Sequence, residues 1–212
     1  MPESIKEQYE RRLPLLAALC KSLLQETEDA LEGVAHIDRI TFRVKSLDSF
    51  LKKVEDPAND PSYEHPLTEI EDQVAGRVIV FFLFDIETIQ ERLAGTYTTV
   101  ERSHRRPKRD EEFGYESHHL ICTIPPHVLP DSWMKLDDPP TTFEIQVRTV
   151  FMHAYSEPQH HFAYKSSTEL PPNVKKELAW IAASAWGADQ AYARVAGWAR
   201  ELDQAEENRT RE

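Results

Sequence analysis

Cysteine and long apolar segments are both scarce in this sequence, and this scarcity excludes several classes of protein. The two cysteines, Cys20 and Cys122, lie far apart and match neither a disulfide nor a metal-ligand spacing. The longest apolar run, residues 78–84, is much shorter than the ~20 residues that cross a bilayer. The amino-terminal segment MPESIKEQYE is charged and lacks the apolar core of a secretion signal. We therefore expect a cytoplasmic protein without membrane contact.

Positive charge is also in short supply. Lys and Arg number 25 against 37 Asp and Glu, which gives a formal net charge of −12 and argues against general binding to a nucleic-acid backbone. The cations that are present gather in two clusters. Such local clusters suit a compact polyanion such as a nucleoside triphosphate, although solvated surfaces show the same pattern. The first cluster contains Arg39, Arg43, Lys45, Lys52 and Lys53, and the second contains Arg102, Arg105, Arg106, Lys108 and Arg109.

The order of the expected elements indicates an α/β (α+β) fold around one mixed sheet with helical ends. Helical periodicity predicts helices over residues 3–32, 46–55, 86–93 and 172–201. A further helix should begin near residue 150 and be kinked or interrupted at Pro158. Alternating or fully apolar stretches predict strands over 39–45, 76–82, 97–100, 117–124 and 141–148, with a loop over 103–114.

The segment TTFEIQVRT (141–149) carries the most informative pattern. Strict alternation places Glu144, Gln146 and Arg148 on one face of a strand, opposite its apolar side chains. A surface strand shares this pattern, but Asp72 stands just before the apolar strand 76–82, so the two carboxylates can face one another across neighbouring strands. Two carboxylates beside phosphates are typical of an Mg²⁺ site.

A strand–turn–helix corner over residues 43–53 gathers donors for phosphate. Arg43 and Lys45 share the polar face of the strand, and Ser49 and Lys53 are four residues apart on one face of the following helix. Such a corner offers a triphosphate several charge-assisted hydrogen bonds. An amphipathic helix with solvated lysines is the alternative interpretation.

The segment FGYESHHL (113–120) combines a turn glycine with a tyrosine and two histidines. The Tyr115 ring can stack on a base, although a buried tyrosine with a bonded hydroxyl fits equally. Alternation places His119 with Ser117 on one face and His118 on the other, so His119 is the candidate site residue. The histidine pairs 118/119 and 160/161 also raise the alternative of a zinc hydrolase, which the absence of an HExxH spacing disfavours.

Taken in order, these segments resemble the synthetase domain of the RelA/SpoT family, above all its small single-domain members. The resemblance covers residues 36–166, and each motif is weak alone but informative in this order. The motifs are Arg43-x-Lys45 through Ser49 to Lys53, Asp72 to Arg77, Gly114-Tyr115-x-Ser117-x-His119, Glu144-Ile145-Gln146-x-Arg148-Thr149, and His160 to Tyr164-Lys165.

The resemblance implies a pyrophosphokinase that moves pyrophosphate from ATP to the ribose 3′-hydroxyl of GDP or GTP and makes (p)ppGpp. The implied fold is a mixed five-stranded sheet of the nucleotidyltransferase type, and the implied cofactor is Mg²⁺ on Asp72 and Glu144, with Glu144 also activating the hydroxyl. The other implied roles are adenine stacking by Arg43 and Arg77, phosphate binding by Lys45, Ser49 and Lys53, and acceptor binding by Tyr115, His119, Gln146 and Arg148.

The resemblance also implies how the chain is organised. The synthetase domain (36–166) lies between helical extensions at 1–35 and 167–212, within one globular unit and without the hydrolase domain of the long members. Small members often assemble through terminal helices, which makes a homo-oligomer a prediction here. For Trp180, Trp186 and Trp198 in the last helix, packing in the core is the favoured interpretation and an interface is the alternative.

The acceptor nucleotide is the part of the implied reaction that the sequence determines least. Members that use GDP or GTP usually carry a lysine four residues before the motif tyrosine, where this chain has Glu111, and the basic run 102–109 is a candidate replacement. The FGY motif is similar to toxic small synthetases, which pyrophosphorylate tRNA 3′ ends or adenosine nucleotides and would have an antitoxin partner. A non-catalytic nucleotide-sensing module is the alternative from another class, and the retained Asp72 and Glu144 disfavour it.

Overall fold

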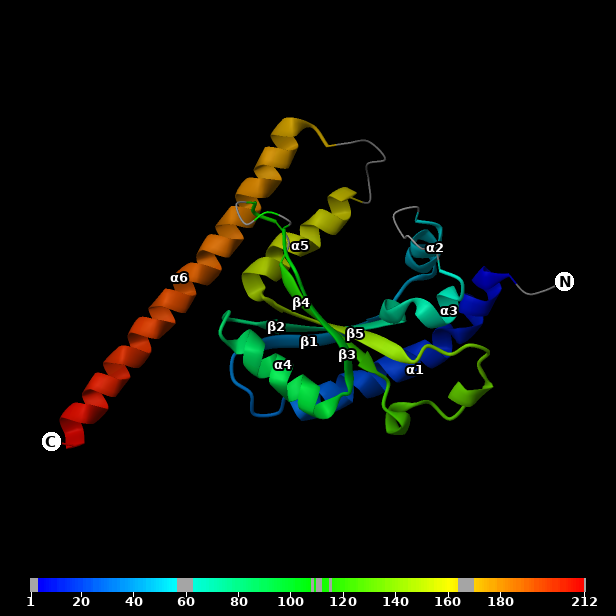
Figure 1. Ribbon diagram of the computed structural model, residues 1–212, viewed down its shortest axis with the longest axis horizontal. Coiled ribbons are helices and arrows are strands. Elements are labelled where there is room, and N and C mark those ends of the chain that lie inside the picture. Colours follow the sequence, from blue (N-terminus) through cyan, green and yellow to red (C-terminus); the bar gives the residue numbers. More distant parts are fainter. Residues whose placement is uncertain are drawn as a thin grey trace.

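A five-stranded sheet forms the centre of the molecule (Figure 1). The computed structural model describes residues 4–56, 63–107, 109, 112–114, 116–163 and 170–211. The strands are β1 (Ile37–Val44), β2 (Val74–Val80), β3 (Thr99–Arg105), β4 (Ser117–Thr123) and β5 (Thr142–Thr149). The helices are α1 (Ile5–Ala30), α2 (Leu47–Glu55), α3 (Pro66–Glu69), α4 (Asp85–Thr96), α5 (Val150–Ala163) and α6 (Pro172–Arg211).

The sheet is mixed, as predicted. Its strand order is β1-β2-β5-β4-β3, in which β2 and β5 run parallel and the other neighbours are antiparallel. Helices α1 and α4 cover one face, while α5 rises from the other and α6 extends away from the body as a long arm (Figure 1). Among the described residues, no helix has both the length and the apolar character needed to cross a membrane.

Helix α1 belongs to the same core as the sheet. It begins at a capping box, in which the Ser4 hydroxyl accepts from the Glu7 backbone N–H and the Glu7 carboxylate accepts from the Ser4 N–H. Its inward side chains pack on β1 and the neighbouring strands, and the buried Arg12 guanidinium donates to the carbonyls of Leu67, Asp137 and Asp138. The amino-terminal helix and the sheet therefore share one hydrophobic core.

The two faces of the sheet differ in polarity because side chains alternate along each strand. On the side of α1 and α4, Phe42, Phe143 and Tyr97 pack together, and the Tyr97 hydroxyl bonds to Thr27 of α1. The Phe42 ring lies directly over Gly76, so closely that a Cβ added there would stand 2.4 Å from the ring. Gly76 is thus required by packing.

One expectation for secondary structure is wrong, and a second is wrong in part. The segment predicted as a loop from residue 103 continues β3 as far as Arg105, because its backbone pairs with β4 while the charged side chains stay exposed at the sheet edge. Helix α5 runs through Pro158 to Ala163, so of the two predicted effects of this proline an interruption is ruled out and a kink stays a prediction. Neither local composition nor proline alone overrides the pairing and packing of the neighbouring elements.

The interpretation of the α6 tryptophans as core residues is also wrong. Trp180, Trp186 and Trp198 are 70%, 41% and 61% exposed. Helix α6 turns small side chains toward the body instead, where the buried Ala182 packs with Met152 and Tyr155 of α5. A long helix can approach another closely through alanines, and of the α6 aromatics Trp186 and Tyr192 contact Phe113 and Phe151 while staying partly exposed.

One buried polar contact ties α6 to the sheet. The Thr149 hydroxyl at the end of β5 donates to Oδ2 of Asp189 at 2.7 Å, and Asp189 is 3% exposed. Its Oδ1 has no hydrogen-bond partner among the described residues. Burial raises the pKa of Asp189 to about 6, because the charged form loses its hydration.

Replacing Gly76 by alanine tests the packing of Phe42. We expect Gly76→Ala to lower the free energy of unfolding by about 1–3 kcal/mol, since the ring must leave its position. Urea unfolding followed by circular dichroism measures the effect. Gly95→Ala is the control, because nothing lies within 4 Å of its added Cβ and alanine is the better helix former. Equal losses in both variants would contradict the packing argument.

Asp189 should make stability depend on pH. Its pKa is raised in the folded state, so its contribution is greatest below the unfolded pKa of about 4 and is lost as pH rises toward about 6. Asp189→Asn keeps an acceptor for Thr149 without the charge. We expect the urea midpoint of this variant to exceed that of the wild type at pH 8, and the two to converge near pH 4. A constant difference across this range would contradict the assignment.

Candidate active site

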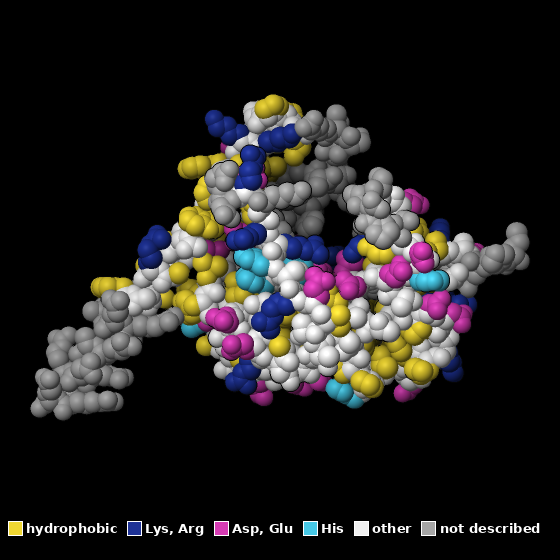
Figure 2. All heavy atoms as spheres, viewed as in Figure 1, with side chains coloured by type: hydrophobic (Ala, Val, Ile, Leu, Met, Phe, Trp, Pro, Cys, Tyr) yellow, Lys and Arg dark blue, Asp and Glu magenta, His cyan; other side chains and the backbone are white. Residues whose placement is uncertain are grey.

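The polar face of the sheet gathers the candidate site residues from four strands. In the register of the sheet, Arg77 lies between Thr41 and Gln146, and Gln146 lies beside His119. Residues in register share a face, so these side chains all project away from the α1 layer. Figure 2 shows basic, acidic and histidine side chains close together near the middle of the molecule.

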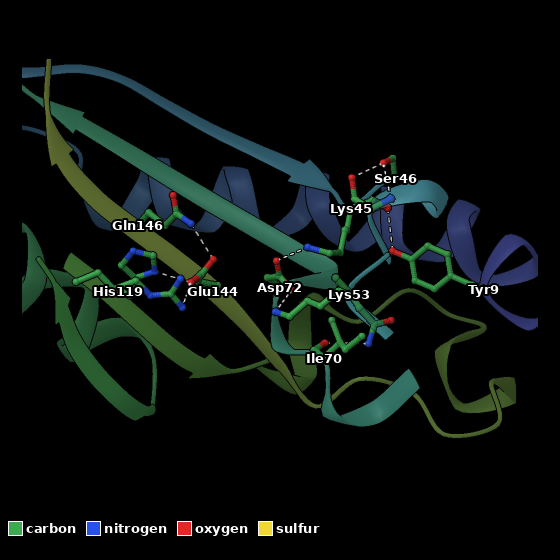
Figure 3. A network of polar contacts seen from close by, with 12 residues as sticks. Tyr9, Lys45, Ser46, Lys53, Ile70, Asp72, His119, Glu144 and Gln146 are labelled. Carbon is green, nitrogen blue, oxygen red and sulfur yellow. Dashed lines mark hydrogen bonds and ion pairs between the residues drawn. The ribbon is translucent and has the colours of Figure 1, made fainter. Parts of the chain in front are cut away.

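Glu144 stands near the centre of this face, on β5. It is 5% exposed, and His119 Nδ1 donates to its Oε1 at 2.5 Å while Gln146 Nε2 donates to its Oε2 at 2.9 Å (Figure 3). Burial acts to raise the pKa of Glu144, but the bonds from His119 and Gln146 outweigh it and hold the pKa below the ordinary value. Glu144 is therefore a carboxylate at neutral pH.

Glu144 is oriented by a chain of hydrogen bonds that runs through Gln146 to Arg148. The guanidinium of Arg148, 2% exposed, donates to Gln146 Oε1 and to the hydroxyl of Ser156 on α5. Because the Gln146 carbonyl oxygen accepts from Arg148, its amide nitrogen is directed to Glu144. The buried arginine thereby fixes both the orientation of Gln146 and the place of α5 on the sheet.

Asp72 lies beside Glu144 in the 3₁₀ turn Glu71–Gln73, just before β2 (Figure 3). Lys45 Nζ lies 2.5 Å from its Oδ2, and Lys53 Nζ lies 2.9 Å from its Oδ1. Burial acts to raise the pKa of Asp72, but the two ammonium groups outweigh this and the pKa lies below its ordinary value. Both lysines predicted to bind phosphates thus lie on one carboxylate.

The strand–turn–helix corner that presents these lysines is held by specific contacts. Ser46 caps α2, as predicted, by accepting from the backbone N–H of Ser49. The buried Tyr9 of α1 donates its hydroxyl to the Lys45 carbonyl at 2.8 Å, and its ring stacks on Phe50 with centroids 3.9 Å apart. The position of Lys45 is therefore set by α1 as well as by β1.

Arg43 and Arg77 lie on adjacent strands and line one small pocket together with Gln146. The Arg77 guanidinium is 2.5 Å from Oε1 of Glu157 on α5, and His153 Nδ1 is 3.7 Å from the same oxygen. Although Pro158 follows Glu157 directly, helix α5 continues through both residues and brings Glu157 to Arg77. Arg43 remains exposed.

The two adjacent histidines point to opposite faces, as alternation predicts. His119 contacts Glu144, whereas His118 stacks on His104 with centroids 4.1 Å apart. Burial, with His104 nearby, lowers the pKa of His118 to about 4. In the described part of the chain, no three His, Cys, Asp or Glu side chains are grouped to hold a metal such as zinc. Tyr115, Glu111, Tyr164 and Lys165, and the side chains of His160 and His161, lie outside the described residues.

Sequence reasoning missed the position of Arg105. Its guanidinium lies 3.8 Å from Oε1 of Glu144, and its side chain is 63% exposed. The alternation of Ser103 and Arg105 with His104 would have indicated a shared face with His119, but only if β3 were known to extend this far. The charged composition of the segment concealed the strand.

Comparisons with known proteins identify the family of this chain. A family described as "Region found in RelA / SpoT proteins" matches residues 42–169. The chain belongs to the RelA/SpoT family. Two of its Bacillus subtilis relatives are the GTP pyrophosphokinases YjbM, 30% identical over 174 residues (80% of this chain, 76% of the relative), and YwaC, 25% identical over 187 residues (86% and 83%).

Solved structures of this kind share the fold. Small alarmone synthetase 1 from Bacillus subtilis superposes with a TM-score of 0.74 at 24% identity, over 91% of this chain and 98% of that one. A GTP pyrophosphokinase family protein from Streptococcus pneumoniae superposes with a TM-score of 0.75 at 19% identity, over 94% and 97%. The Bacillus synthetase has also been solved bound to its product pppGpp and to AMPCPP.

Removing one lysine tests the ion pairs of Asp72. Lys45→Met keeps most of the side-chain bulk, and we expect it to lower the free energy of unfolding at pH 7 by about 1–3 kcal/mol. Because the Asp72 pKa is lowered in the folded state, this stabilisation is present above the ordinary pKa of about 4 and is lost as pH falls further. Urea titrations at pH 7 and at a pH below the ordinary pKa of about 4 measure this stabilisation. Lys21→Met, on the exposed side of α1, is the control. A loss that persists unchanged in acid would contradict the ion-pair explanation.

Proposed function

We propose that this protein transfers pyrophosphate from ATP to the ribose 3′-hydroxyl of GDP or GTP and so makes (p)ppGpp. The observation that carries the proposal is the buried, ionised Glu144, held between His119 and Gln146 on the polar face. A carboxylate that keeps its charge while partly shielded from water is suited to accept a proton from a hydroxyl. On the polar face, Glu144 lies between the side that carries Lys45 and Lys53 and the side formed by β4 and β3.

The lysine-rich side is the proposed ATP site. Lys45, Ser49 and Lys53 would bind the phosphates, and Arg43 and Arg77 would hold the adenine between them. Their closeness supports this assignment: the two arginines line one pocket, and both lysines contact Asp72. Because a triphosphate carries more negative charge than a single carboxylate, ATP would draw the lysines from Asp72 to its phosphates.

Mg²⁺ is the proposed cofactor, and the residues fit it. Asp72 and Glu144 lie side by side on this face (Figure 3), and Mg²⁺ in nucleotide sites commonly needs only one or two carboxylates with phosphates and water. When bound, the ion would neutralise charge that develops on the phosphates. The lysines and the hydrogen bonds from His119 and Gln146 keep both carboxylates in the ionised form that a metal requires.

The reaction follows from these positions. Glu144 accepts the proton of the acceptor 3′-hydroxyl, and the oxygen forms a bond to the β-phosphorus of ATP. The bond between that phosphorus and the oxygen bridging to the α-phosphorus breaks, and AMP leaves with its electrons. His119 and Gln146 keep the carboxylate aligned, while Lys45 and Lys53 offset the charge of the phosphates. Tyr115 and Arg148, with His119 and Gln146, are the proposed acceptor-side residues.

The relatives support the same function. Both curated relatives are named GTP pyrophosphokinases, and a structural neighbour has been solved with pppGpp as its product. An oligomer through the terminal helices stays a prediction, which the exposed Trp180 and Trp198 on α6 favour. An antitoxin partner also stays a prediction.

A direct test is incubation of the pure protein with Mg²⁺, labelled ATP and one acceptor at a time, followed by separation of the products. We expect a labelled tetra- or pentaphosphate with GDP or GTP. Transfer only to AMP or to tRNA would replace the guanine acceptor by the toxin-like alternatives. Folded protein that binds ATP but transfers to no acceptor would leave only a nucleotide-sensing module.

The role of Glu144 is tested by Glu144→Gln, which keeps the shape but not the basicity. We expect the transfer rate to fall about 10²- to 10⁴-fold, with ATP affinity changed far less. Glu91→Gln on the exposed side of α4 is the control and should keep full activity. A fully active Glu144→Gln protein would show that another group accepts the proton.

A further inference from the structure

Two lysines hold the two oxygens of the Asp72 carboxylate, one oxygen each. Lys45, directly after β1, bonds to Oδ2, and Lys53 of α2 bonds to Oδ1. Figure 3 shows the ends of both side chains converging on Asp72, with Glu144 beside it. The carboxylate proposed as a metal ligand is thus already the partner of two cations of this chain.

The charges at this place are balanced within the chain. Asp72 and Glu144 carry two negative charges, and Lys45 and Lys53 carry two positive ones. The guanidinium of Arg105, 3.8 Å from Glu144, adds a further positive charge. A divalent cation is attracted by an excess of negative charge, and these five side chains together do not provide one.

A metal ion on Asp72 would have to compete with these lysines. Each carboxylate oxygen has a second lone pair beside the one that an ammonium group uses. A metal ion bound there would stand close to that ammonium group, and the two positive charges would repel each other. The competition is easiest to relieve at Lys53, because its side chain is 34% exposed against 9% for Lys45.

Phosphates offer the lysines another partner. A triphosphate carries more negative charge than one carboxylate, so an ammonium group that turns to it gains attraction. The Asp72 oxygen then loses its competing cation, and the phosphate oxygens add ligands of the kind that Mg²⁺ prefers.

We propose that Lys45 and Lys53 keep divalent metal from Asp72 until a triphosphate draws them away, so that metal and ATP strengthen each other's binding. This inference rests on the proposed function, which assigns ATP to these lysines. Its consequence is opposite to that of a simple phosphate-binding lysine: removal of Lys53 should improve the binding of metal by the protein without nucleotide.

The first test is a titration of the nucleotide-free protein with Mn²⁺, which takes the same oxygen ligands as Mg²⁺. The electron paramagnetic resonance signal of the free ion measures binding. We expect Lys53→Met to bind Mn²⁺ at least about 10-fold more tightly than the wild type, and the double variant Lys53→Met/Asp72→Asn to lose this gain. Lys52→Met is the matched control, because it removes the same charge from the exposed side of α2 and should bind Mn²⁺ as the wild type does.

The second test measures the coupling from the nucleotide side. AMPCPP is titrated calorimetrically into the protein with Mg²⁺ and, separately, with a chelator. We expect Mg²⁺ to strengthen AMPCPP binding at least about 10-fold in the wild type and far less in Asp72→Asn. Circular dichroism checks the fold of each variant, and Lys45→Met replaces Lys53→Met in the first test if the latter does not fold.

Several outcomes would overturn the inference. Wild-type protein that binds Mn²⁺ as tightly as Lys53→Met would show that the lysines do not exclude metal, and a gain that survives Asp72→Asn would place the ion elsewhere. Equal strengthening of AMPCPP by Mg²⁺ in the wild type and in Asp72→Asn would remove the coupling. Transfer to GDP is assayed separately: normal transfer without the Mn²⁺ contrast overturns this inference alone, whereas the contrast without transfer to any acceptor overturns only the proposed function.

Discussion

The buried carboxylate of Glu144, with the hydrogen bonds that keep it ionised, is the interaction on which the site depends. A buried charge loses its hydration, and this loss must be offset by hydrogen bonds. His119 and Gln146 form such bonds to the Glu144 carboxylate. Arg148 then fixes Gln146 and reaches Ser156 on α5. At the end of the same strand, Thr149 joins β5 to α6 through Asp189. One strand thus connects the candidate site to both carboxy-terminal helices.

The sheet also separates two tasks that would interfere if they shared a surface. One face is closed by α1 and α4 and is packed so tightly that Phe42 leaves room only for a glycine at position 76. The other face carries the charges, with lysines near β1 and β2 and Arg105 at the outer edge. Because β5 lies between β2 and β4, Glu144 stands between the lysines on one side and β4 and β3 on the other.

The local pattern of polar and apolar residues predicts most helices and strands correctly, but it does not predict which of their faces are buried in the folded chain. Alternation placed His118 and His119 on opposite faces, and the apolar run near residue 78 identified the buried strand β2. The charged composition of residues 103–105 predicts a loop, whereas they end strand β3, because edge-strand pairing leaves no apolar signature. The spacing of the α6 tryptophans is compatible with a core, whereas they are exposed, because helical periodicity does not tell which face of a long helix another helix covers.

Local sequence pattern is sufficient to predict the five strands and the long helices in their order, the chemical groups that each motif brings together, and the family that the motifs resemble. These features depend on residues a few positions apart, whose relative placement follows from the geometry of one helix or strand. The tertiary structure alone decided that Lys45 and Lys53 meet Asp72, that Glu157 meets Arg77 and that Arg105 reaches Glu144. Those contacts join segments 19 to 80 residues apart, and only strand order and register, set by the packing of the whole chain, bring such segments together.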